Sequence, residues 1–527
     1  MKMFELDTQM PPIVQNEMMR RKATYRPLKS DNSVAKIYYF ISNGVKQEPL
    51  KLWRLVFIVL LIVLCTALTS TLWFTNAFWL TVRKFNVISN HSISFNYFEH
   101  LPVDRMSFCI YVYNYTNVDQ YYARDLGSEE EEEDQLAVDY LGPYCFRESP
   151  EKRSLKFQDD NRRLAYKEAT VFSFDAEASN GTLSDEVVVP NFPYLVVTSM
   201  GVDYNALFRL ALATHIHTKR YQPFIKLNTS DFFFGYDDPL MDWVVGKASL
   251  LNIKVPFERF GLLDALLSFI NVEVQVDTGV GDVTRAGKVT GFKGSSKMNF
   301  WKTSACNNYQ GGEGTFWDVD KVQRGENIMF FASLLCRNIE LNKIGEVDYE
   351  GSKVPRYEII PDMFHKERAA FDCYCHNCTT NLLDMRQCLD GFPFKATFPK
   401  FYGLDPSHLT HLKNLPEPDP NDWSTIFDIH PYMGITLRFT QRMQLNLEIR
   451  KTSFLNLPPK IPNGAILPTV SMDRNIYDLR SDARTLLYHA LTTLPVVEIV
   501  LKYLGVMFAI FLLYVVFLDL KRLCNQF

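Results

Sequence analysis

Two long runs of apolar residues dominate the hydropathy pattern of the chain. The first, residues 55–82, has no charged residue and is bracketed by basic residues on both sides. The second, residues 494–520, carries Glu498 and Lys502 near its start, four positions apart, where they can pair on one helix face. About 20 apolar helical residues cross a bilayer, so each run predicts a transmembrane helix.

Shorter patterns fill the region between the two runs. Residues 435–449 alternate apolar and polar positions, as expected for a strand with one buried face. Other short segments are rich in β-branched or aromatic residues and are bounded by Gly, Pro or Asn. They predict strands at residues 108–113, 272–276, 288–292 and 356–360. The region therefore reads as a mostly antiparallel β-structure.

Helical periodicity appears twice within this region, at residues 204–220 and 257–271. In the first helix, one face is predicted to carry Leu207, Leu210, Ala211 and Thr214. The basic residues Lys219 and Arg220 close its C-terminal end, where they complement the helix dipole.

The distribution of charge predicts the orientation of the chain. Residues 1–54 hold ten Lys/Arg against five Asp/Glu, and Lys521 and Arg522 follow the second run. Since basic flanks stay in the cytosol, we expect cytosolic tails at 1–54 and 521–527 and an extracellular or lumenal ectodomain at 83–493. The net charge of −4 does not suggest a nucleic-acid-binding protein.

Glycosylation sequons segregate in the same way. All five lie between the two runs and none lies in the tails, which agrees with the charge pattern. The predicted acceptors are Asn90, Asn114, Asn180, Asn228 and Asn377.

Eight of the ten cysteines lie in the predicted ectodomain, and four of them crowd into residues 372–388. In an oxidising compartment an even number favours disulfides over zinc binding or thiol exchange. Eight cysteines allow 105 pairings, so the connectivity stays open at this point. Cys524, just beyond the second run, is a candidate for palmitoylation.

Catalytic and cofactor motifs are missing from the sequence. There is no nucleophile elbow, no zinc-protease motif and no phosphate-binding loop, so we expect neither an enzyme nor a bound cofactor or metal. The acidic run at residues 129–134 is interpreted as a solvated surface insertion, with a cation site as the alternative.

A series of short motifs resembles the class B scavenger receptor family. Each motif is weak alone, but together they keep one order between the two spans and cover about residues 50 to 520. The motifs lie at residues 142–147, 234–239, 255–262, 278–301, 354–357, 427–434 and 442–446.

The resemblance implies a fold and a set of disulfides. The fold is a two-pass membrane protein with an α+β ectodomain: an antiparallel β-barrel-like core, an internal hydrophobic tunnel and a membrane-distal helical bundle. The implied pairs are Cys306–Cys373, Cys336–Cys388 and Cys375–Cys378. The two remaining ectodomain cysteines, Cys109 and Cys145, are then expected to join each other, a bridge that the family pattern does not supply.

The resemblance also implies a receptor that binds lipid at the helical bundle and passes it through the tunnel to the membrane. The expected ligands are fatty acids, sterols, phospholipids or lipoproteins, and protein ligands and homo-oligomers stay open. Cations at the bundle would attract anionic head groups, and the candidates are Lys219, Arg220 and Lys226.

Two other classes of function stay open. One is a protein-binding adhesion or lysosomal sorting receptor on the same fold. The other is a two-span ion channel, which the second run disfavours because it offers little but Gly505 to a pore. We expect the plasma membrane as the location, with the lysosomal or endosomal membrane as the alternative.

Overall fold

The computed structural model describes residues 52–123, 135–251, 259–374, 379–452 and 455–524 of the 527-residue chain. The chain divides into two compact units. Unit 1 comprises residues 1–68 and 505–527, and unit 2 comprises residues 69–504.

Unit 1 holds parts of two long apolar helices, α2 (Leu52–Phe74) and α14 (Ser481–Cys524). Both are long and apolar enough to cross a membrane. Within unit 1 the Cys65 thiol donates to the Gly505 carbonyl oxygen at 3.6 Å, and Arg54 Nε lies 3.9 Å from Asp519 Oδ2. The two helices therefore contact each other directly.

The apolar run at residues 55–82 is not one helix. α2 ends at Phe74, and α3 (Ala77–Arg83) begins after Asn76. The Thr75 hydroxyl donates to the Thr71 carbonyl oxygen and accepts from the Ala77 amide, so a side chain replaces a helical backbone partner at this point. At the other end, α14 begins 13 residues before the predicted start at 494.

Unit 2 is built on a sheet of 14 strands in the order β7-β6-β3-β2-β1-β16-β15-β14-β10-β9-β8, with β11, β12 and β13 attached to it. A separate two-stranded antiparallel sheet pairs β4 with β5. The five segments predicted as strands fall in β1, β6, β7, β10 and β15, which confirms them. The strands are β1 (Val103–Tyr115), β2 (Leu136–Gln158), β3 (Arg163–Phe174), β4 (Glu186–Pro190), β5 (Phe224–Asn228), β6 (Glu273–Asp277), β7 (Val289–Phe292), β8 (Ile328–Ala332), β9 (Arg337–Tyr349), β10 (Ser352–Glu358), β11 (Leu383–Asp384), β12 (Phe394–Thr397), β13 (Leu412–Lys413), β14 (Ile426–Ile429), β15 (Thr436–Glu448) and β16 (Ile466–Leu479).

A two-glycine segment joins the two edges of the sheet and nearly closes it into a barrel. The Val289 amide of β7 donates to the Gly311 carbonyl oxygen, and the Gly312 amide donates to Met329 of β8, both at 3.0 Å. A Cβ on Gly311 would lie 2.5 Å from the backbone of Phe330. Only glycine allows this approach, so Gly311 is required for closure.

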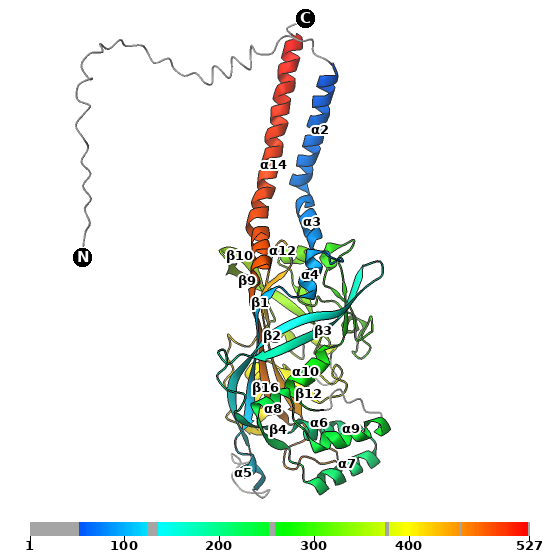
Figure 1. Ribbon diagram of the computed structural model, residues 1–527, viewed down its shortest axis with the longest axis vertical. Helices are drawn as coiled ribbons and strands as arrows, with labels where there is room; N and C mark the ends of the chain where they lie inside the picture. The colour runs from blue at the N-terminus through cyan, green and yellow to red at the C-terminus, as the bar shows by residue number, and fades with distance from the viewer. Residues whose placement is uncertain (1–51, 124–134, 252–258, 375–378, 453–454, 525–527) are drawn as a thin grey trace, which may run out of the picture. The chain divides into compact units, whose positions relative to one another are not determined.

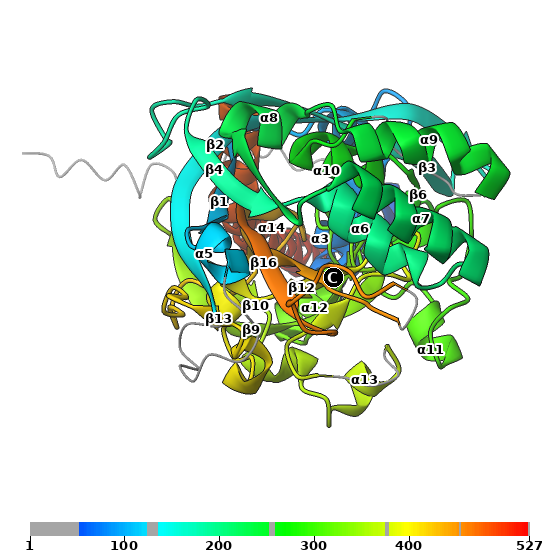
Figure 2. The same ribbon diagram turned by 90° about the horizontal axis from the view of Figure 1, so that it is seen from below.

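Helices lie at both ends of the barrel. α3 and α4 are at one end of unit 2, while α6, α7 and α9 gather at the opposite end, with the β4–β5 sheet beside them (Figures 1 and 2). This second group is the helical bundle predicted from the family resemblance. The helices of unit 2 not yet given are α4 (Ile93–Glu99), α5 (Val118–Ala123), α6 (Phe192–Gly201), α7 (Ala206–Lys219), α8 (Thr229–Phe234), α9 (Pro239–Leu251), α10 (Leu262–Ile270), α11 (Ser304–Asn307), α12 (Val319–Arg324) and α13 (Ala369–Asp372).

The predicted helix at 204–220 exists as α7, but it packs through a different face. Its buried residues are Phe208, Leu212 and Ile216. Leu207 and Leu210, on the predicted apolar face, are 80% and 61% exposed. Both stripes are apolar, and the larger Phe208 side chain fits the core, where it packs against Tyr204 and Trp243.

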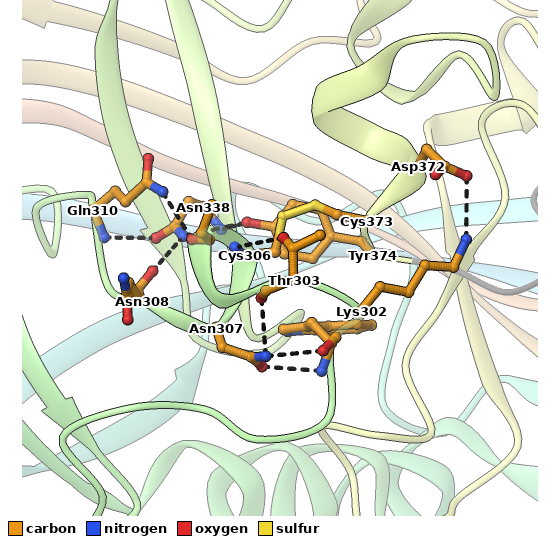
Figure 3. Close-up of a disulfide and its surroundings, with 12 residues drawn as sticks. Lys302, Thr303, Cys306, Asn307, Asn308, Gln310, Asn338, Asp372, Cys373 and Tyr374 are labelled. Carbon is orange, nitrogen blue, oxygen red and sulfur yellow. Dashed lines mark hydrogen bonds and ion pairs between the residues drawn. A yellow bond between two sulfur atoms is a disulfide. The ribbon is translucent and has the colours of Figure 1, made fainter.

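Among the residues that the structure describes, three disulfides stabilise unit 2: Cys109–Cys145, Cys306–Cys373 and Cys336–Cys388. Around Cys306–Cys373, Lys302 pairs with Asp372 at 3.2 Å, and the Asn338 amide donates to the Tyr374 hydroxyl (Figure 3). Cys109 and Cys145 are directly opposite each other in the β1–β2 pair. Cys375, Cys378 and the acidic run at 129–134 lie outside the described residues.

The Cys109–Cys145 bridge yields the first prediction. Replacing both cysteines with serine should lower the free energy of unfolding by about 4 kcal/mol, because the bridge closes a loop with a sequence separation of 36 residues. Thermal denaturation of the purified protein measures the loss, and peptide mapping without reduction identifies the bridge.

The matched control is Cys65→Ser, since Cys65 is a free cysteine and its replacement should leave the unfolding transition unchanged. Recovery of Cys109 as a free thiol, or bonded to another cysteine, would contradict the pairing.

Candidate functional site

Three cavities follow one another through the interior of unit 2. The basal cavity, of about 370 Å³, lies among α4, β16 and the first turns of α14. The central cavity, of about 180 Å³, lies between β2, β3, β8 and β15. The apical cavity, of about 40 Å³, lies beneath α6 and α10, near the helical bundle.

Adjoining cavities share parts of their walls. The central and apical cavities have five wall residues in common: Phe108, Leu266, Leu334, Met443 and Met472. The central and basal cavities also share wall residues, among them Phe330. The three spaces therefore form one series inside the barrel, running from the bundle end to the end that holds α3, α4 and the start of α14.

Most of the walls are apolar, which suits the hydrocarbon part of a ligand. The basal cavity is bounded by side chains such as Phe85, Ile93, Phe316 and Leu486. The apical cavity is bounded by aromatic, aliphatic and methionine side chains throughout, including Phe192 and Phe260. Methionine is flexible and adapts to irregular apolar shapes, so Met443 and Met472 suit a wall that must accommodate a chain.

A ring of polar residues interrupts this apolar interior between the central and basal cavities. We name it the collar and define it by Glu148, Lys152, Glu168, Glu313, Gln441 and Arg474. Four of these residues, Glu168, Glu313, Gln441 and Arg474, line both cavities.

Strand geometry brings the collar together. Along β2, Glu148 and Lys152 are four residues apart and point inward, as does Phe146. Lys152 lies directly opposite Glu168 in the β2–β3 pair, and Gln441 lies opposite Arg474 in the β15–β16 pair. Glu313 follows the glycine segment that closes the barrel, so closure itself delivers this carboxylate to the interior.

Two ion pairs hold most of the collar charges. Arg474 donates to both carboxylate oxygens of Glu148, at 2.6 and 2.8 Å, a two-point contact that fixes its guanidinium. Lys152 Nζ lies 3.5 Å from Glu313 Oε2 and 3.6 Å from the centroid of the Phe98 ring. The Lys152 side chain is 3% exposed, and no described residue accepts a hydrogen bond from its ammonium group.

Glu168 is the one carboxylate of the collar without a partner among the described residues. Among the residues that the structure describes, none donates a hydrogen bond to its carboxylate or forms an ion pair with it. Burial raises the pKa of Glu168, and the nearby Glu313 and Glu148 raise it further, while Arg474 and Lys152 lower it. Because Glu168 lines two cavities, its remaining exposed surface faces the interior of the barrel.

The cations predicted as a ligand site lie far from this interior, on the surface of the bundle end. Lys219 is the last residue of α7, and Arg220 caps the helix in a left-handed conformation with φ 55°. Both are exposed. Lys226, on β5, is also exposed but pairs with Glu186 at 2.7 Å. None of the three lines the apical, central or basal cavity.

The structure places four of the five predicted glycan acceptors. Asn90, Asn180 and Asn228 are exposed. Asn114 is half-buried in β1, where its side-chain oxygen accepts from the Val188 amide at 2.7 Å. Asn377 lies outside the described residues.

The palmitoylation candidate, Cys524, is the last residue of α14.

Sequence reasoning missed the collar, although part of its signal is local. In residues 146–152, apolar and charged residues share one face of a strand, which is unusual for an inward face. The other collar residues, Glu313, Gln441 and Arg474, lie far away in the sequence, so this local pattern does not reveal them. Within the described ranges, no group of three or more His, Cys, Asp or Glu side chains is placed to hold a metal ion.

Comparison with known proteins identifies relatives over most of the chain. The model of the CD36 family matches residues 56–520. Scavenger receptor class B member 1 of Rattus norvegicus is 26% identical over 339 residues, which cover 63% of this chain and 65% of the rat protein, slightly less than two thirds of its length.

Two other relatives extend the range of the comparison. Lysosome membrane protein 2 of Mus musculus is 25% identical over 466 residues, covering 86% of this chain and 92% of the mouse protein. Sensory neuron membrane protein 1 of Antheraea polyphemus is 25% identical over 386 residues, covering 68% of this chain and 70% of its own length.

The unpaired carboxylate gives a prediction on pH-dependent stability. The pKa of Glu168 is raised in the fold, so the native state holds the proton more tightly than the unfolded chain, where the pKa of glutamate is about 4.3. Ionisation above the folded pKa therefore costs stability, and this cost disappears as the pH falls below the unfolded pKa. Glu168→Gln should stabilise the protein at pH 8, with the gain vanishing near pH 4.

Thermal denaturation of the detergent-purified protein between pH 4 and pH 8 measures this gain. Glu151→Gln is the matched control, because Glu151 lies on the neighbouring strand β2, pairs with Arg153 and lines none of the three cavities. A wild-type protein more stable than Glu168→Gln at pH 8 would show that the ionised carboxylate is favourable in the fold.

Proposed function

The chain belongs to the CD36 family, and we propose that it is a two-pass membrane receptor that binds lipids or lipoproteins and passes lipid through its interior. The observation that carries this proposal is the series of three adjoining, mostly apolar cavities inside the barrel. The names of its relatives, which include scavenger receptor class B member 1, agree with a receptor role.

The physical reason for an internal route is the cost of exposing hydrocarbon to water. Each methylene group taken out of water is stabilised by about 0.8 kcal/mol, so a long acyl chain leaves a membrane or lipoprotein only if another apolar surface receives it. The walls of the apical and central cavities supply such a surface, and their methionines allow chains of different shape to fit.

The proposed exit lies at the basal cavity. Its wall includes Leu487, Ala490 and Leu494 of α14, and Leu494 is the residue where the apolar run of this helix begins. It also includes Val82, the last residue of the first apolar run, and Phe85, three residues further on. Lipid in the basal cavity would therefore be close to the residues that enter the bilayer.

We further propose that residues 83–493 form the ectodomain, with cytosolic tails at 1–54 and 521–527 and glycans on the predicted asparagines. We place the protein at the plasma membrane. The lysosomal membrane is the second candidate, favoured by the match to mouse lysosome membrane protein 2 over 86% of this chain. Lys219, Arg220 and Lys226 are proposed as contacts for anionic lipid at the bundle surface.

The main test is lipid carriage by the full-length protein purified from a eukaryotic cell. We expect copurifying lipid by mass spectrometry and saturable binding of a labelled fatty acid or cholesteryl ester. Ala490→Trp should reduce binding by about tenfold or more, because it places an indole ring in the basal cavity and removes space from the route.

Thr485→Trp is the matched control, since Thr485 is exposed on the same helix and lines no part of the cavity. A lipid-free protein that binds none of these ligands would favour an adhesion or sorting receptor on the same fold. Equal binding by both tryptophan variants would remove the basal cavity from the route.

The bundle cations give a separate prediction. Reversing Lys219, Arg220 and Lys226 to glutamate should weaken binding to phosphatidylserine vesicles by at least about tenfold, since each surface cation near an anionic membrane contributes ~1 kcal/mol. Vesicle co-sedimentation at low and physiological salt measures the change.

The control reverses Arg153, Lys156 and Lys167, three exposed cations on β2 and β3, which gives the same change in net charge. If both triple variants bind the vesicles equally, vesicle binding depends on the net charge of the protein and not on the positions of Lys219, Arg220 and Lys226.

A further inference from the structure

The collar is the polar constriction of an otherwise apolar route, and its composition is specific. It combines three carboxylates, Glu148, Glu168 and Glu313, with two cations, Lys152 and Arg474. A lipid that extends from the central into the basal cavity must lie against these groups, because four of the six collar residues face both spaces. The chemistry of the collar therefore decides which head groups can occupy this position.

Neither cation is free to neutralise an incoming anion. The Arg474 guanidinium makes three contacts with Glu148, at 2.6, 2.8 and 3.1 Å, and it also lies 5.6 Å from the Phe439 ring centroid. The Lys152 ammonium lies between the Glu313 carboxylate and the Phe98 ring. With all five groups ionised, three negative charges stand against two positive ones.

Two of the charged groups in the collar nevertheless lack hydrogen-bond partners among the described residues. Lys152 Nζ is buried and has hydrogens to donate, with no acceptor among the described residues. Glu168 has oxygens to accept, with no donor in the same part of the chain. The two residues are opposite each other across β2 and β3, and both line the basal cavity. Buried groups of this kind are normally satisfied, so they point to a missing partner.

We propose that the collar binds a lipid head group that donates a hydrogen bond and carries no negative charge, with a long-chain alcohol as the simplest case. A hydroxyl group has one hydrogen to donate to Glu168 and lone pairs to accept from Lys152. A carboxylate can only accept, so it would leave Glu168 without a donor and place like charges together. This inference rests on the proposed function and specifies which lipids the interior accepts.

The test compares two ligands with the same hydrocarbon chain, hexadecanol and hexadecanoate, at pH 8. Each displaces a fluorescent acyl-chain probe from the full-length protein in detergent. We expect hexadecanol to bind at least about tenfold more tightly than hexadecanoate, because the carboxylate leaves a buried polar group unpaired. In Glu168→Gln the two affinities should converge through tighter binding of hexadecanoate, since the amide accepts like a carboxylate but is uncharged and also donates.

Glu151→Gln, outside the three cavities, should keep the wild-type ratio. Melting temperatures of both variants check that they fold, and Glu168→Gln should fold because the amide has nearly the size of the carboxylate and lies at the wall of a cavity. Equal affinity of the wild type for both ligands, or an unchanged ratio in Glu168→Gln, would overturn the inference and leave lipid carriage intact. Displacement by neither ligand would instead count against the proposed function.

Discussion

Closure of the sheet is the constraint on which the rest of unit 2 depends. An open sheet of this size would present backbone donors and acceptors along β7 and β8, and such edges pair with other chains. Here the Gly311–Gly312 segment bonds to both edges, and the absence of a Cβ permits an approach that no other residue could make. Once the ring is nearly complete, the inner faces of strands distant in sequence confront one another.

A closed sheet with this many strands encloses more space than its inward side chains fill, and the cavities are the result. Their walls divide by position. Near the bundle they consist of Phe, Leu and Met side chains, whereas near the start of α14 they also include the collar. An interior that binds hydrocarbon need only be apolar, but one that discriminates between head groups needs a few polar groups held in fixed positions.

The collar meets that requirement because two of its carboxylates are held in ion pairs and the third is not. Arg474 and Glu148 are fixed by a two-point contact, and Lys152 is held by Glu313 and an aromatic ring. Glu168 has no partner of this kind among the described residues, and burial raises its pKa. A buried charge without a partner is destabilising, and such residues commonly serve function rather than stability. The same side chain thus connects the pH dependence of stability to ligand selection.

The sequence by itself determined the features that depend on local pattern: the two apolar runs, the strands in β1, β6, β7, β10 and β15, the existence of α7, and membership of the family, which the comparison confirms. These features follow from the hydropathy of a segment, from the spacing of its apolar residues and from the order of the motifs along the chain. Tertiary structure decided the rest. It selected Phe208, Leu212 and Ile216 as the packed face of α7, because two apolar stripes compete and only the core distinguishes them. It also assembled the collar, because strand pairing brings residues 148, 152, 168, 441 and 474 to one interior face, and closure of the sheet adds Glu313.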